Sequence, residues 1–187
     1  MSRDPGGKEA FEPATGDGPP FTGDAEQRSR EVRSALDGLR QIRRLTAAPG
    51  AGAVPALWER TRPVRAVALA LEGGGLAPSA VDAAGARTAT GYRVRAGERP
   101  ATAVVEWLGP PGSGAAGREA EALAACADVL GRLGWEALLY KGPRGRRFLE
   151  VEPAGPAGTA AGPGPPGAGR APGGGGGGAG ARRRAGG

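Results

Sequence analysis

Four basic residues surround one turn late in the chain, and they are the first candidates for chemistry. Lys141, Arg144, Arg146 and Arg147 lie around a Gly-Pro-Arg-Gly turn between two predicted strands. A basic hairpin can bind anions or enter a nucleic-acid groove. The alternative is a turn that keeps the chain soluble and protects a sheet edge. We favour this structural role and keep the four residues as a possible anion or nucleic-acid contact.

A glycine motif is the second candidate. Residues 112–117 read GSGAAG, which matches the G-x-G-x-x-G loop that lets backbone amides approach a pyrophosphate at a helix N-terminus. Here Gly109-Pro110-Pro111 separates the motif from its strand, and Lys141 stands where a ribose-binding acid is expected. With 37 Gly in 187 residues the pattern arises easily by chance. We therefore expect no nucleotide cofactor.

The chain offers little for catalysis. It has no His and a single cysteine, Cys126, so the sequence contains no Cys/His cluster that would hold a metal ion. General acid–base work would fall to carboxylates, whose spacing shows no pair. Cys126 lies beside the apolar stripe of a predicted helix, and we interpret it as a small buried hydrophobe. We predict a protein that is not an enzyme and needs no cofactor.

The net charge of +6 is not a guide to function, because it is peripheral. Residues 100–152 carry seven acidic and six basic side chains, whereas the tail 153–187 carries four Arg and no acid. The 23 Arg against two Lys, with abundant Ala, Gly and Pro, indicate a GC-rich coding sequence. The arginine excess is therefore weak evidence for a nucleic-acid partner.

The stretch 91–152 must position these candidates, and it has the clearest pattern in the chain. It reads as strand, strand, helix, strand, strand. The strands Thr102–Leu108 and Trp135–Tyr140 are apolar on both faces, which predicts two neighbours in the middle of the sheet. The last strand alternates Leu149 and Val151 with glutamates, as an edge strand would. The fold class we predict is α+β: a four-stranded, mainly antiparallel sheet (β-β-α-β-β), one or two additional N-terminal helices, and disordered termini.

Two helices follow from apolar residues spaced by three or four. The first begins after the N-cap Asp24 and spans about 22 residues, with several arginines on its other faces. The second runs from about Ala116 to Leu133 and is closed by Gly134. The predicted buried stripes are Val32, Leu36, Leu39, Ile42 and Leu45 in the first helix, and Ala120, Leu123, Ala127, Leu130 and Leu133 in the second.

Between these helices the pattern is weaker. Pro55–Arg62 predicts a short helix, and Val64–Leu71 fits a helix better than a strand because of its alanines. A DNA-reading helix-turn-helix over the following glycines is a weaker alternative to a structural connector, because Gly91 ends the recognition helix after about one turn. The expected organisation is a disordered arm (1–23), a partly ordered helical region (24–90), the α+β core (91–152) and a disordered tail (153–187).

These features of the sequence do not identify an activity. The longest apolar run, Val64–Leu71, is too short for a membrane span, and a single Cys fits a reducing cytoplasm. Our leading hypothesis is a soluble, non-enzymatic accessory module that binds another protein, or itself, through the sheet or the helix over 24–46. The alternative is a nucleic-acid-binding protein that uses the basic hairpin and the arginine-rich helix.

Overall fold

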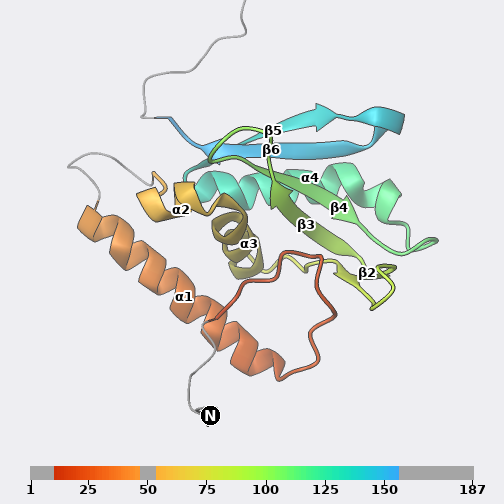
Figure 1. Cartoon of the computed structure of the whole chain (residues 1–187), viewed down its shortest axis with the longest axis horizontal. Helices are drawn as coiled ribbons and strands as arrows, with labels where there is room; N and C mark the ends of the chain where they lie inside the picture. The colour runs from red at the N-terminus through yellow and green to blue at the C-terminus, as the bar shows by residue number, and fades with distance from the viewer. Residues whose placement is uncertain (1–10, 47–53, 156–187) are drawn as a thin grey trace, which may run out of the picture.

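The computed structural model describes residues 11–46 and 54–155, and within them it confirms the predicted α+β fold (Figure 1). A four-stranded antiparallel sheet is preceded by helices, and β1 and β2 pair separately. The elements are α1 (Ala25–Thr46), α2 (Leu57–Thr61), α3 (Pro63–Gly73), β1 (Ala80–Val81), β2 (Arg87–Ala89), β3 (Gly91–Ala96), β4 (Ala103–Leu108), α4 (Ala115–Arg132), β5 (Trp135–Lys141), the short 3-10 turn η1 (Pro143–Gly145) and β6 (Arg147–Pro153).

The strand order is β3-β4-β6-β5, and this corrects the predicted arrangement of the sheet. The strand predicted to pair with β4 in the middle, β5, lies at an edge, whereas β6, predicted as an edge, lies between β4 and β5. The crossover through α4 leaves room for one strand, and the tight β5–β6 hairpin folds β6 into that space. Alternation in β6 therefore reports a sheet covered on one face and not an edge position.

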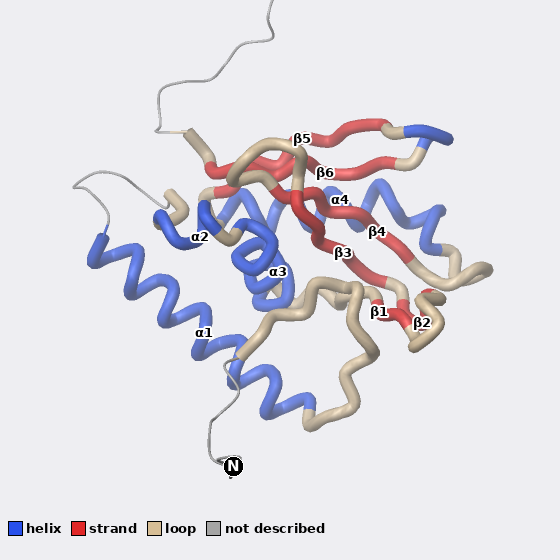
Figure 2. The backbone as a smooth tube through the Cα atoms, viewed as in Figure 1, coloured by secondary structure: helices blue, strands red, loops and turns tan. Residues whose placement is uncertain are grey.

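The helices cover one face of the sheet in two layers (Figures 1 and 2). Side chains of α3 and α4 share one core with the inward residues of the strands, and α1 packs on the outside of α3. The opposite face of the sheet carries no helix among the described residues. The largest fully buried side chains of the core are Trp135, Tyr92, Leu71, Leu123, Leu130 and Leu149.

Helix α4 begins and ends within about one residue of the prediction, but its buried face differs. Ala120 is exposed, and the buried face instead includes Glu119, Cys126 and Val129. Cys126 is fully buried as predicted, and this burial raises the pKa of its thiol to about 12. Gly134 adopts a φ of 79°, as a glycine closing a helix does.

Helix α1 begins as predicted, because Oδ1 of Asp24 accepts hydrogen bonds from the backbone N–H groups of Glu26 (2.8 Å) and Gln27 (3.3 Å). Only the first three members of its apolar stripe are buried: Val32, Leu36 and Leu39 pack around Leu69 of α3. The last two members of the stripe, Ile42 and Leu45, are exposed.

Residues 11–23, which the sequence predicts as part of a disordered arm, lie along the β3 side of the sheet in this structure. The backbone N–H of Val94 donates to Thr15 O (2.7 Å), and that of Val81 donates to Gly18 O (2.9 Å). Gly16 has a φ of 85°, and a Cβ there would collide with the Tyr92 carbonyl oxygen. These contacts join segments that are distant in the sequence, so no local pattern of residues predicts them.

The other predicted connectors and termini lie partly inside and partly outside the described residues. The segment after α3 forms the small β1–β2 hairpin, which agrees with a connector and provides no recognition helix. The first part of the predicted arm (1–10), the Gly/Pro break (47–53) and most of the predicted tail (156–187) lie outside the described residues.

Candidate functional site

Two of the four basic residues of the hairpin, Arg146 and Arg147, contact helix α4. Nε of Arg146 donates to Oε1 of Glu119 (3.1 Å), and the backbone N–H of Arg147 donates to Oε2 of the same carboxylate (3.0 Å). Glu119 is buried, and the Arg147 guanidinium lies 3.8 Å from it. Lys141 is exposed at the end of β5, and Arg144 lies in the turn η1. Two of the four predicted contact residues therefore hold the hairpin in place.

The two basic elements of the nucleic-acid hypothesis lie at opposite ends of the molecule. In Figure 1 the β5–β6 turn is at the upper right and α1 runs along the lower left. Two α1 arginines also point inward, since Arg28 pairs with Glu72 (2.6 Å) and Arg43 with Glu59 (2.5 Å). The hairpin and α1 therefore do not form one continuous basic surface.

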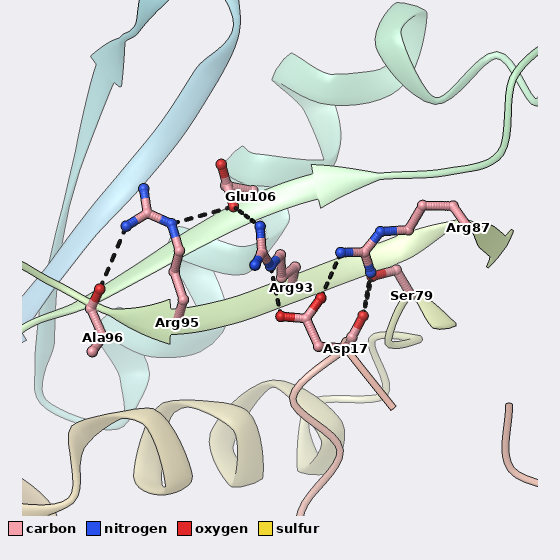
Figure 3. Close-up of polar contacts among 8 residues, drawn as sticks. Asp17, Ser79, Arg87, Arg93, Arg95, Ala96 and Glu106 are labelled. Atoms are coloured by element: carbon pink, nitrogen blue, oxygen red, sulfur yellow. Dashed lines mark hydrogen bonds and ion pairs between the residues drawn. The ribbon is translucent and has the colours of Figure 1, made fainter. Parts of the chain in front are cut away.

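A row of alternating charges, which the sequence did not indicate, fastens the arm to the sheet (Figure 3). Asp17 accepts from Arg87 (2.5 Å) and from Arg93 (2.7 Å). Glu106 on β4 then accepts from Arg93 (3.3 Å) and pairs with Arg95 (3.5 Å). Each carboxylate bridges two guanidinium groups, so the row satisfies itself. Asp17 lies 70 and 76 residues before its two arginine partners, so no spacing signal links it to them.

A pocket of about 940 Å³ lies between the arm, the first turns of α1 and residues 77–80. Several of its polar lining groups are engaged with one another. Arg28 pairs with Glu72, and the Ser79 hydroxyl donates to Gly16 O (2.8 Å). Much of the remaining lining is proline and alanine. The pocket is thus a space spanned by the arm, with no convergent set of polar groups that would select a ligand.

The glycine motif spans the loop before α4 and the first turn of the helix: Gly112 and Gly114 are exposed in the loop, and Gly117 lies in α4. Gly112 and Gly114 have φ values of 78° and 72°, and Gly114 is the N-cap of the helix without a side-chain capping bond. The turn itself therefore accounts for glycine at these two positions.

The open edge of the sheet is the most distinctive surface, and we define it as the β5 residues Ala137–Lys141. Within the described residues β5 pairs with β6 alone. Leu138, Leu139 and Tyr140 are 40%, 57% and 42% exposed, and they stand side by side, whereas the other exposed large hydrophobics of residues 11–46 and 54–155 are scattered over other parts of the chain. Leu139 lies on the helix-covered face opposite Leu149, whereas Leu138 and Tyr140 lie on the uncovered face.

The hydrogen-bonding pattern shows which backbone groups of the open edge point outward. Beyond either end of β5, Gly142 N–H donates to Arg146 O (2.7 Å) and Ala154 N–H donates to Gly134 O (3.0 Å), in register with the β5–β6 pairing. Bonding alternates along an antiparallel strand, so even-numbered β5 residues bond to β6. The N–H and C=O groups of Ala137, Leu139 and Lys141 are therefore directed away from the sheet.

The opposite edge of the sheet is closed, which makes the open edge unusual. Along β3, Tyr92 N–H donates to Ala77 O (3.0 Å), Ser79 N–H donates to Tyr92 O (2.8 Å), and Thr15 accepts from Val94. The arm and the segment before β1 thus complete that side. The sequence does not indicate the open edge, because the apolar pattern of β5 is equally typical of a central strand.

Comparison with known proteins does not identify the chain: no family model, no curated protein and no solved structure matches it. Among residues 11–46 and 54–155, no group of three or more His, Cys, Asp or Glu side chains is placed to hold a metal ion. None of the helices in these ranges is long and apolar enough to cross a membrane.

Proposed function

We propose that this protein is a non-enzymatic binding module that receives an extended segment of a polypeptide along its open edge. The observation that carries the proposal is a strand edge with outward backbone groups and three exposed apolar side chains. Strand addition of this kind takes its affinity from backbone hydrogen bonds and its selectivity from alternate side chains. The single cysteine, Cys126, fits a reducing compartment, so we place this module in the cytoplasm.

The amino-acid composition of the open edge favours a binding role over that of an ordinary solvent-exposed edge strand. Edge strands are usually protected by charges, prolines, bulges or a covering segment. The open edge has one charged residue, Lys141, at its end, and no proline. On the uncovered face Tyr140 stacks on Phe148 with ring centroids 5.7 Å apart, which extends the apolar surface onto β6. An incoming strand would cover this surface on both faces of the sheet.

The test places a charge on the open edge. In Leu139→Lys the new ammonium would meet any incoming strand on the helix-covered face, so we expect the full chain to lose its polypeptide partner. The matched control is Leu57→Lys on α2, because Leu57 is also exposed (74%) but lies away from the edge. Pull-downs with the two variants and the wild type, followed by mass spectrometry, make the comparison.

The outcome is decided with purified components. A protein captured by the wild type and Leu57→Lys, but not by Leu139→Lys, should protect the outward amides of Ala137, Leu139 and Lys141 from hydrogen exchange when it is added back. Capture of the same proteins by all three chains would show that binding, if any, occurs elsewhere.

A further inference from the structure

We propose that the open edge binds a second copy of this chain, with the two β5 strands antiparallel and centred on Leu139. This inference rests on the proposed function, because it names the partner of the same edge. The resulting dimer would have one continuous eight-stranded sheet and a two-fold axis through the Leu139 pair. A two-fold interface requires a patch that is complementary to itself, and the open edge meets that requirement in three ways.

The first is the backbone. The outward residues are Ala137, Leu139 and Lys141, which are symmetric about Leu139. In this register Leu139 pairs with Leu139 of the second copy, and Ala137 pairs with Lys141 of the second copy. Each such pair exchanges two hydrogen bonds, so the three pairs form about six. All outward groups of the open edge are then satisfied.

The second is the side chains. On the uncovered face Leu138 lies opposite Tyr140 of the second copy, twice by symmetry, and on the helix-covered face the two Leu139 side chains meet. Every exposed apolar residue of β5 thus faces another. Centring the pair on Leu138 instead would oppose Tyr140 to Glu136 and Lys141 to the buried Trp135. The apolar pattern therefore favours Leu139 as the centre.

The third is charge. The beginning of β5 is acidic, because Glu136 lies opposite Glu152 of β6. The end of β5 is basic, because Lys141 lies opposite Arg147 and the turn brings Arg146 beside Gly142. Antiparallel pairing places the acidic end of each copy next to the basic end of the other, with Glu136 on the uncovered face and Lys141 of the second copy on the helix-covered face. The attraction therefore acts across the sheet and is weaker than that of a directly opposed pair. In the chosen register Glu136 lies opposite Gly142 of the second copy, which has no side chain to block it.

Disulfide trapping tests the pairing and its register in the full chain. In Leu139→Cys the two Cα atoms would lie about 5.5 Å apart, within the range that a disulfide spans. In Glu136→Cys the two positions would lie six residues apart along the strands, about 20 Å. Mild oxidation should crosslink the first variant and leave the second uncrosslinked, while the native Cys126 stays buried and unreactive.

Charge exchange provides a second measurement. Glu136→Lys or Lys141→Glu alone would bring like charges near each other at both ends of the interface. We expect each to weaken the dimer roughly two- to threefold, because the two side chains lie on opposite faces of the sheet. The double variant reverses both ends and should restore most of the affinity. Sedimentation over a wide range of protein concentration measures the dimer dissociation constant of each variant. Added salt should weaken the wild-type dimer.

The outcomes separate this inference from the proposed function. A wild-type dimer that Leu139→Lys dissociates and Leu45→Lys does not supports the inference. A wild-type monomer whose captured protein is still lost in Leu139→Lys overturns self-pairing and leaves the binding module intact. A dimer that Leu45→Lys dissociates and Leu139→Lys does not, or one that Leu139→Cys fails to trap, overturns pairing about Leu139.

Discussion

At the scale of single residues, Asp17 is the clearest example of a side chain whose importance is tertiary. It lies in a Gly/Pro-rich stretch with no periodicity, yet its two carboxylate oxygens bridge Arg87 and Arg93. Through this bridge the arm is fastened across the end of the sheet beside β3 (Figure 3). The closed edge of the sheet thus depends in part on one acidic residue.

This bridge makes the arm sensitive to acid. Burial alone would raise the pKa of Asp17, but the hydrogen bonds from Arg93 and Arg87 outweigh it and lower the pKa below 3.8. The stability from these ion pairs is therefore complete above pH 3.8 and is lost as the pH falls through the lower folded pKa. Because the carboxylate is partly exposed, we expect these ion pairs to contribute less than about 1 kcal/mol to the free energy of unfolding.

The measurement is an NMR titration of the Asp17 carboxyl carbon. The protein Asp17→Asn should show the same free energy of unfolding as the wild type in acid and a slightly smaller one near neutral pH. A titration midpoint above 3.8 would contradict this account.

At the scale of elements, the β5–β6 hairpin is held against α4 by one buried carboxylate. Glu119 accepts from Arg146 and from the backbone of Arg147, at the end of the hairpin that carries the turn. The contact holds the open edge in a defined position at its basic end. Arg146 and Arg147, two of the four residues predicted as a binding cluster, therefore also stabilise the fold.

We expect Glu119→Gln to lower the free energy of unfolding by roughly 1–3 kcal/mol, because it removes charge-assisted hydrogen bonds at a buried site. Chemical denaturation monitored by Trp fluorescence would measure it. Glu121→Gln is the matched control: Glu121 is exposed on the same helix, and its substitution should stay within about 0.5 kcal/mol. Equal effects of the two substitutions would show that Glu119 does not anchor the hairpin.

At the scale of the whole molecule, α1 is attached to the domain at three places. Arg28 pairs with Glu72 near its beginning, apolar residues pack on α3 in its middle, and Arg43 pairs with Glu59 near its end. Arg43 also donates to Leu133 O (2.7 Å), at the end of α4. This arginine therefore joins three helices, and the buried Glu59 carboxylate depends on it.

Arg43→Met should destabilise the protein strongly, because it leaves the fully buried Glu59 carboxylate without this cation. A loss of roughly 3–5 kcal/mol is typical when one partner of a buried pair is removed. Adding Glu59→Gln to the same chain should recover part of it. Arg40→Met, at an exposed pair with Asp37, is the control and should change the free energy of unfolding by no more than about 0.5 kcal/mol.

The sequence alone determined the local elements of this protein. The spacing of apolar residues located α1 and α4, alanine content favoured a helix at α3, and Asp24 and Gly134 marked helix ends. Short apolar runs, alternating or continuous, located the strands of the sheet. These signals are local, because a helix or a half-buried strand repeats its environment every few residues. The absence of His and the single buried cysteine also follow from composition and local pattern.

Tertiary structure decided strand order, the path of residues 11–23 and the open edge. An apolar pattern on both faces of β5 is compatible with a central or an edge position, and only the insertion of β6 beside β4 placed β5 outside. Likewise, the Asp17 row and the Glu119 contact join residues distant in the chain. Pairing between distant segments leaves no periodic trace, because each partner contributes one residue whose environment is created by the fold.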